Sequence, residues 1–132
     1  MRLTQVRILM VDDFESWRRF ASSLLRRKPE LQVVGEASDG LEAVRKAVEL
    51  KPDLILLDIG LPILNGFEAA LQIRKLVPES KIIFLTQESA GDVIQEALRL
   101  GASGYVLKTR AESDLLTAVE AVLTRKTFVS KT

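Results

Sequence analysis

Short apolar segments alternate with longer amphipathic segments along the whole chain, and this alternation restricts the possible folds more than any other feature. Each apolar segment is too short for a typical helix, whereas apolar residues recur every three or four positions in each amphipathic segment. Such alternation is typical of parallel strands joined by right-handed helical connections, with helices on both faces of the sheet. The sequence therefore predicts a doubly wound α/β domain with strands at 7–11, 31–36, 54–57, 81–86 and 104–108.

An amphipathic helix is predicted after each of these strands. Pro29, Pro78 and Gly101 lie just beyond three of the helices and end them. No internal repeat, linker or low-complexity segment interrupts the alternation. The apolar faces of the helices comprise Trp17, Phe20, Ala21, Leu24 and Leu25; Leu41, Val44, Ala47 and Val48; Phe67, Ala70, Ile73 and Leu76; Val93, Ala97 and Leu100; and Leu115, Val119 and Val122.

The composition excludes several classes of site. The chain has no cysteine, which excludes disulfides and thiolate metal sites, and no histidine, which excludes a histidine general base and argues against zinc. The 19 basic and 18 acidic residues leave a net charge of +1, which gives no electrostatic case for binding nucleic acid. No apolar run approaches the ~20 residues of a membrane span, and no signal peptide precedes the first strand. We therefore expect a cytoplasmic protein that uses carboxylate, lysine, threonine or serine side chains.

The stretch Leu54–Gly66 is the most informative part of the sequence. Four consecutive apolar residues predict a strand buried on both faces, Asp58 follows them, and glycine, proline and asparagine then break the chain. Because the carboxyl ends of parallel strands lie at one edge of the sheet, polar residues at those ends are expected to meet. The other polar residues at predicted strand ends are Asp12, Asp13, Thr86 and Lys108.

Asp12, Asp13 and Asp58 would place three carboxylates at this edge. At ~4 Å each pair would repel by about 1 kcal/mol in water and by about 4 kcal/mol at an effective dielectric near 20. Lys108 supplies one positive charge, and a divalent cation would supply the remainder. Oxygen ligands favour Mg²⁺, which usually shares its coordination shell with phosphate. The sequence therefore predicts a magnesium site.

Each of these residues, taken alone, also has an ordinary structural interpretation. Carboxylates and hydroxyls cap helices and shape turns more often than they carry chemistry. What favours a functional site is that the polar residues lie at the same end of successive strands. The structural alternatives are helix capping for Asp12 or Asp13 with Glu15, a turn before Gly60 for Asp58, helix capping for Thr86 with Ser89, a solvated strand end for Lys108 and a half-buried sheet position for Tyr105.

These motifs resemble the receiver domain of two-component response regulators, and the resemblance covers nearly all of the chain. It lies in the pair Asp12-Asp13, in Asp58-Ile-Gly-Leu-Pro with Gly66, in Thr86, and in the segment Gly101–Lys108. That last segment is most similar to regulators of the NarL/FixJ type, whose output is a helix-turn-helix DNA-binding domain. The resemblance implies a flavodoxin-like, or CheY-like, fold with a five-stranded sheet in the order 2-1-3-4-5 and five helices.

The resemblance also implies roles for the residues at the edge of the sheet. Asp58 would accept a phosphoryl group, and Lys108 would contact that group. Asp13, Asp58 and the Gly60 carbonyl would bind Mg²⁺ directly, with Asp12 acting largely through water. A carboxylate can form a covalent acyl phosphate when the transferring oxygens are neutralised, which a metal ion and one lysine achieve.

Thr86 and Tyr105 would form the conformational switch, with Tyr105 turning inward on phosphorylation. Two neighbouring positions depart from the family pattern. Thr109 follows Lys108 where the family usually has proline in a cis bond, so this loop is expected to sit differently. Gln87 follows Thr86 where a small residue is common, so access to the acceptor is expected to be narrower.

The implied domain organisation is a receiver domain at 1–125 and the start of a linker at 126–132, with an output domain outside this chain. The expected partners are a sensor histidine kinase or phosphotransfer protein, a second copy of the chain on phosphorylation, and DNA only through the output domain. Apart from its own phosphorylation and dephosphorylation, no catalysis is expected. A stand-alone regulator that acts through its surface is the alternative.

Three other classes of protein compete with this interpretation. A haloacid-dehalogenase-type phosphatase also forms aspartyl phosphate, but it needs an Asp-x-Asp spacing, whereas Asp12 and Asp13 are adjacent. A nucleotide- or flavin-binding domain would carry a glycine-rich phosphate loop after a strand, and the sequence has none. A receiver-like module that is never phosphorylated would not need the full set of polar residues.

Overall fold

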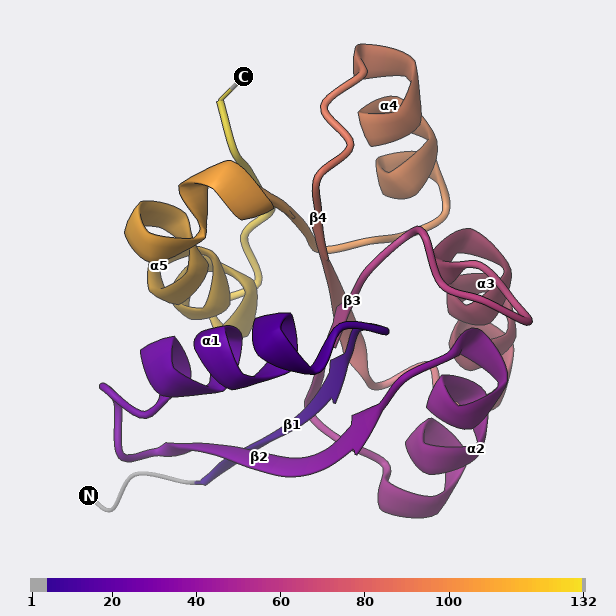
Figure 1. Ribbon diagram of the computed structural model, residues 1–132, viewed down its shortest axis with the longest axis horizontal. Coiled ribbons are helices and arrows are strands. Elements are labelled where there is room, and N and C mark those ends of the chain that lie inside the picture. Colours follow the sequence, from indigo (N-terminus) through magenta and orange to yellow (C-terminus); the bar gives the residue numbers. More distant parts are fainter. Residues whose placement is uncertain (1–4, 132) are drawn as a thin grey trace.

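A six-stranded parallel sheet lies between two groups of helices in the computed structural model, which describes residues 5–131 (Figure 1). Residues 1–4 and 132, which the predicted domain and linker include, lie outside the described residues. The strands are β1 Val6–Val11, β2 Leu31–Ala37, β3 Leu54–Leu57, β4 Lys81–Thr86, β5 Gly104–Leu107 and β6 Phe128–Val129. The helices are α1 Glu15–Leu25, α2 Gly40–Leu50, α3 Gly66–Leu76, α4 Gly91–Arg99, α5 Ala111–Leu123 and the 3-10 turn η1 Lys108–Arg110.

The predicted five-stranded sheet is wrong by one strand, because the order is β2-β1-β3-β4-β5-β6. Phe128 and Val129, which were assigned to the start of a linker, pair in parallel with Gly104 and Tyr105. An unpaired edge on β5 would leave backbone donors and acceptors without partners, and β6 satisfies part of that edge. A strand of two residues is too short to show the alternation by which strands are recognised in a sequence.

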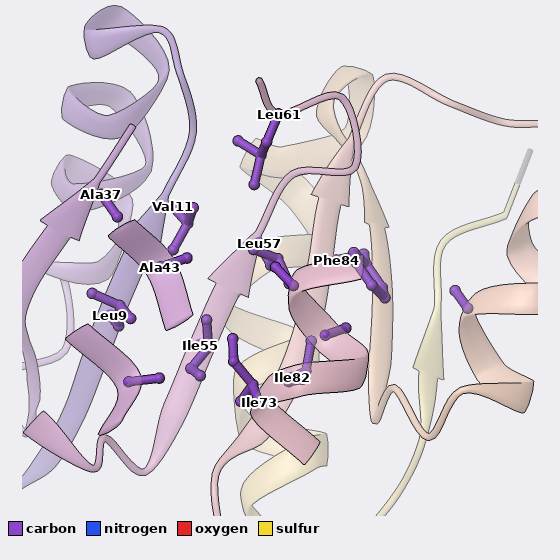
Figure 2. Close-up of a cluster of buried hydrophobic side chains, with 14 of the residues drawn as sticks. Leu9, Val11, Ala37, Ala43, Ile55, Leu57, Leu61, Ile73, Ile82 and Phe84 are labelled. Atoms are coloured by element: carbon purple, nitrogen blue, oxygen red, sulfur yellow. The ribbon is translucent and has the colours of Figure 1, made fainter. Parts of the chain in front are cut away.

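The sheet separates two apolar layers. In one, α2, α3 and α4 pack on side chains such as Leu9, Ile55 and Phe84 (Figure 2). In the other, α1 and α5 pack on the opposite face, where Phe128 of β6 also lies. All four residues of β3 are buried, which confirms the prediction of a strand covered on both faces. Among residues 5–131, no helix has the length and apolarity needed to span a bilayer.

The apolar face predicted for α2 is partly wrong. Ala43, Val44 and Ala47 are buried as the helix packs on the sheet, whereas Leu41 and Val48 are exposed. The helix positions its small residues against the strands and α3, which allows close approach. Helical spacing alone identifies the apolar face of a helix, but it does not determine which residues of that face contact the sheet.

Parallel strands bring the carboxyl ends of β1, β3, β4 and β5 to one edge of the sheet. Two loops at this edge are closed by short-range hydrogen bonds. Asp39 accepts a bond from the Glu42 N–H at the start of α2, and Asn65 and Glu68 form a reciprocal capping box at the start of α3. These caps hold the ends of the helices that surround the polar cluster.

Candidate functional site

The side chains of Asp12, Asp58 and Lys108 meet at the carboxyl edge of the sheet. The Lys108 Nζ lies 2.6 Å from Asp12 Oδ2 and 3.4 Å from Asp58 Oδ2, and all three side chains are buried. Lys108 is therefore a buried cation between two carboxylates, which excludes the alternative of a solvated strand end. It begins η1 rather than ending β5 as predicted.

Asp13 completes a group of three carboxylates. Asp12, Asp13 and Asp58 each provide an oxygen atom that lies within 4.8 Å of the others, and Asp13 is exposed. Oxygen donors, one of them open to water, match a divalent cation that keeps part of its hydration shell, as Mg²⁺ does. The donor set therefore fits the predicted metal.

Asp58 is positioned by the turn that follows β3. Its Oδ1 accepts a hydrogen bond from the Ile59 N–H at 2.8 Å. The Gly66 N–H donates to the Ile59 carbonyl at 2.7 Å, and a Cβ atom on Gly66 would lie 2.1 Å from the Asp58 carbonyl oxygen. Because only glycine fits there, the start of α3 can close on the backbone of Asp58.

A cavity of about 430 Å³ opens beside Asp58. Asp13, Gly60, Thr86 and Lys108 line it together with Asp58, whereas Asp12 and Tyr105 do not. Gln87 also lines this cavity and is exposed, which places it where it can restrict access to Asp58. A hydroxyl, an ammonium and the carboxylate of Asp13 therefore border the space beside Asp58.

Burial makes the charged form of Asp12 costly. Burial raises the pKa of Asp12 above its ordinary value, although the hydrogen bonds from Lys108 and from the Phe14 N–H act in the opposite direction. Buried carboxylates retain their charge only when cations or donors compensate for lost hydration. The cluster therefore favours an additional positive charge beyond that of Lys108.

Asp13 and Thr86 do not cap the helices that follow them, so the helix-capping interpretation of these two residues is wrong. The residue preceding α1 is Phe14, and no side chain caps that helix. The residue preceding α4 is Ala90, again without a side-chain cap, and the Thr86 Oγ1 accepts only a long 3.4 Å bond from the Glu88 N–H. These polar groups are therefore not engaged in closing helix ends.

Tyr105 is fully buried in β5 rather than half-buried. Its hydroxyl donates a hydrogen bond of 2.7 Å to the Glu88 carbonyl in the loop between β4 and α4. Burial, with smaller contributions from the charges of Glu88 and Asp58, raises the pKa of Tyr105 to about 12. The Tyr105 ring already points into the protein in this structure. The expected inward turn of Tyr105 on phosphorylation would therefore not begin from an exposed ring.

The loop after β5 begins with a short 3-10 turn. Lys108, Thr109 and Arg110 form the 3-10 turn η1, and every peptide bond between residues 5 and 131 is trans. Thr109 is exposed at the outer side of the turn.

Trp17 contacts the site in a way that its predicted place on an apolar helix face did not reveal. The Lys108 Nζ lies 4.9 Å from the centre of the Trp17 ring, over its face. Such a cation–π contact stabilises a buried ammonium. The Glu88 carbonyl was also missed, because a backbone acceptor carries no signal in the sequence.

Comparison with known proteins gives consistent matches over this fold. A model described as the response regulator receiver domain matches residues 8–120. The transcriptional regulatory protein LiaR of Bacillus subtilis is 40% identical over 116 residues, which are 88% of this chain and 55% of that protein. The chain therefore spans about half the length of the curated relatives it matches.

Two solved structures extend the comparison. A two-component response regulator of the LuxR family from Aurantimonas sp. SI85-9A1 is 34% identical with a TM-score of 0.90, covering 95% of this chain and 89% of that chain. The signal receiver domain of the response regulator NarL from Mycobacterium tuberculosis is 26% identical with a TM-score of 0.86, covering 92% of this chain and 98% of that chain.

Proposed function

We propose a function that starts from the family: this chain belongs to the response regulator receiver domain family and is the receiver domain of a two-component response regulator. In this function Asp58 accepts a phosphoryl group. The observation that carries the proposal is a buried carboxylate beside a cavity, with the Lys108 ammonium 3.4 Å from one of its oxygens. The similarity to the NarL structure and to LiaR places the chain with regulators of the NarL/FixJ type.

In the proposed reaction an Asp58 oxygen forms a bond to phosphorus while the bond between phosphorus and the donor breaks. Lys108 lies close enough to neutralise negative charge on the transferring oxygens. Asp13, Asp58 and the Gly60 carbonyl would hold Mg²⁺, with Asp12 acting largely through water, and the metal would supply further neutralisation. The donor is a sensor histidine kinase or a phosphotransfer protein. No further reaction is proposed beyond formation and hydrolysis of the acyl phosphate.

We propose that Thr86 and Tyr105 convert phosphorylation into a change of shape. The Thr86 hydroxyl lies in the cavity beside Asp58 and can donate to a phosphoryl oxygen. Because the Tyr105 hydroxyl bonds to the loop that follows Thr86, movement of this loop would alter the surroundings of the ring. Beryllofluoride should shift the Tyr105 ring signals in NMR spectra of wild type but not of Thr86→Ala; unchanged signals in wild type would contradict the switch.

The longer relatives support a proposal about the whole protein. LiaR, a transcriptional regulatory protein, is nearly twice as long as the matched region. We propose that this chain is the input part of a regulator of transcription, with a receiver domain that includes β6 and with DNA binding confined to an output domain. Dimerisation on phosphorylation would alter how that output domain is presented.

Intact mass spectrometry tests the phosphorylation directly. Wild type incubated with acetyl phosphate and Mg²⁺ should gain the mass of one phosphoryl group, and Asp58→Asn should gain none. Asp92→Asn, which alters an exposed aspartate on α4, is the matched control and should react like wild type. Equal labelling of wild type and Asp58→Asn would refute the assignment of the acceptor.

A further inference from the structure

The loop that carries Lys108 lacks the constraint that a proline would provide. A proline after the lysine would restrict one backbone dihedral, whereas Thr109 leaves both of its dihedrals free. Nevertheless the Lys108 ammonium is buried and lies within contact distance of two carboxylates. Other interactions must therefore hold the backbone on either side of Lys108.

On the strand side, the backbone of Leu107 is held by Ser130. The Ser130 Oγ accepts a hydrogen bond from the Leu107 N–H at 3.2 Å, and the Ser130 N–H donates to the Tyr105 carbonyl at 2.8 Å. Ser130 is only 3% exposed although it follows the short edge strand β6. A buried serine at this position ties the C-terminal segment to the residue immediately before Lys108.

On the helix side, the residue that ends η1 is held by Asp114. The Asp114 Oδ2 accepts hydrogen bonds from the Arg110 Nε at 3.1 Å and from the Ser130 Oγ at 2.7 Å. Burial acts to raise the pKa of Asp114, but the bonds from Ser130, Arg110 and Ser113 outweigh it and hold the pKa below its ordinary value. The charged carboxylate is thus the form that joins both ends of the loop.

We infer that Ser130 and Asp114 are positioning residues for Lys108, acting as a hydrogen-bonded clamp across the Leu107–Arg110 loop. The inference rests on the proposed phosphorylation of Asp58, since its effect on rate requires that reaction. The clamp would also couple β6 to the phosphorylation site. A change that displaces Ser130 from Leu107 would make the position of Lys108 less fixed. Conversely, a phosphoryl group that binds Lys108 would stabilise the paired state of β6. Such coupling is reciprocal by thermodynamic necessity.

The test compares Ser130→Ala with Ser80→Ala. Ser80 is a buried serine whose hydroxyl donates to the Pro52 carbonyl, far from the loop, so it matches the loss of one buried hydroxyl. With acetyl phosphate and Mg²⁺, Ser130→Ala should lower the maximal rate constant of phosphorylation by about three- to tenfold, the range expected for one lost hydrogen bond. The Mg²⁺ concentration for half-maximal rate should stay unchanged, and Ser80→Ala should react within about twofold of wild type.

Two further measurements separate positioning from general stability. The double variant Ser130→Ala/Asp114→Asn should be no slower than the slower single variant, because both act through one clamp. NMR signals of the Lys108 side chain should shift or broaden in Ser130→Ala and not in Ser80→Ala, whether or not phosphate is present. Rates and Lys108 signals equal in the two serine variants would overturn the inference. If wild type accepts no phosphoryl group, the proposed function fails, and the Lys108 signals still decide the clamp.

Discussion

The interior of the sheet and its carboxyl edge are built from the same strands but obey opposite rules. Leu54–Leu57 of β3 are buried among other apolar side chains, and Figure 2 shows Ile55 and Leu57 among them. The next residue, Asp58, is buried beside the Lys108 ammonium. The same change occurs between Leu85 and Thr86. Burying an aliphatic side chain stabilises the fold by about 1.5–3 kcal/mol, whereas burying a charge costs free energy unless partners compensate for it.

This difference separates the part of the molecule that the fold requires from the part that holds the candidate site. The raised pKa of Asp12 shows that the pairing with Lys108 does not fully offset burial. The charged form of the buried Asp12 carboxylate is therefore not favoured by packing at this edge. We therefore expect substitutions in the interior to change the free energy of unfolding and substitutions at the edge to change binding and reactivity.

The largest expected loss of stability comes from Phe84→Ala. Phe84 is fully buried in β4, and its ring packs edge-to-face on Phe67 at 5.3 Å. Removing it should lower the free energy of unfolding by about 3–5 kcal/mol, because the cavity adds to the lost burial. Urea denaturation measures the change. Leu76→Ala, at a 59% exposed position, is the control and should alter stability by less than about 0.5 kcal/mol.

The second expected effect is that Mg²⁺ stabilises the folded protein by binding at the carboxyl edge of the sheet. At ten times its dissociation constant, Mg²⁺ should raise the free energy of unfolding by about 1.4 kcal/mol, because it binds the folded state. Asp13→Asn removes an exposed member of the carboxylate group and should greatly reduce this gain. Thermal unfolding with and without Mg²⁺ measures it.

Glu49→Gln on the outer face of α2 provides the control for Mg²⁺ binding. It removes one negative charge far from the cluster and should leave the stabilisation intact. An equal gain in wild type and Asp13→Asn would show that the metal binds elsewhere, and a reduced gain in Glu49→Gln would indicate a general charge effect.

The interior was easier to predict from sequence than the edge strand and the loops. The alternation of strands and helices leaves few topologies, and the strand ends at Asp12, Asp58 and Thr86 followed directly from it. Strand β6 was not predicted because two residues are too few to show an alternation of apolar and polar positions. The hydrogen bond that Ser130 accepts from the Leu107 N–H joins positions 23 residues apart in the sequence. Hydrogen bonds between residues distant in the chain depend on the folded backbone.

Burial of individual side chains was also only partly predictable. A half-buried sheet position was the structural alternative for Tyr105, yet its ring is fully buried and the Glu88 carbonyl satisfies its hydroxyl inside the protein. Leu41 and Val48 are exposed because α2 rests on its alanines. In both cases the deciding partner lies on another element.

A smaller effect is expected for Asp58→Asn on stability without Mg²⁺. Breaking a buried ion pair usually destabilises a protein because one charge is left unpaired. Here Lys108 keeps Asp12 as a partner at 2.6 Å, and one of three crowded negative charges is removed. The free energy of unfolding should therefore stay within about 1 kcal/mol of wild type. A loss approaching that of Phe84→Ala in urea denaturation would show that Asp58 is part of the structural core.

The smallest effect concerns Tyr105, whose ring lies in the interior and whose hydroxyl reaches the edge loop. Its pKa is raised to about 12, whereas an unfolded tyrosine ionises near 10. The neutral hydroxyl therefore stabilises the fold fully below about pH 10, and this contribution is lost as the pH rises toward 12. Nothing should change at neutral pH.

Tyrosinate absorbance can follow this ionisation without ambiguity, because Tyr105 is the only tyrosine in the sequence. The midpoint in the folded protein should lie well above 10. Lysines also titrate in this range, so urea midpoints of wild type should be compared with those of Tyr105→Phe at each pH. The difference between them, set at lower pH by the lost hydrogen bond to Glu88, should stay constant up to about pH 10 and change only above it, where unfolded tyrosine loses its proton. A midpoint of the absorbance titration near pH 10 in the folded protein would mean that water reaches the Tyr105 hydroxyl. Tyr105 would then belong to the hydrated edge of the sheet and not to its buried interior.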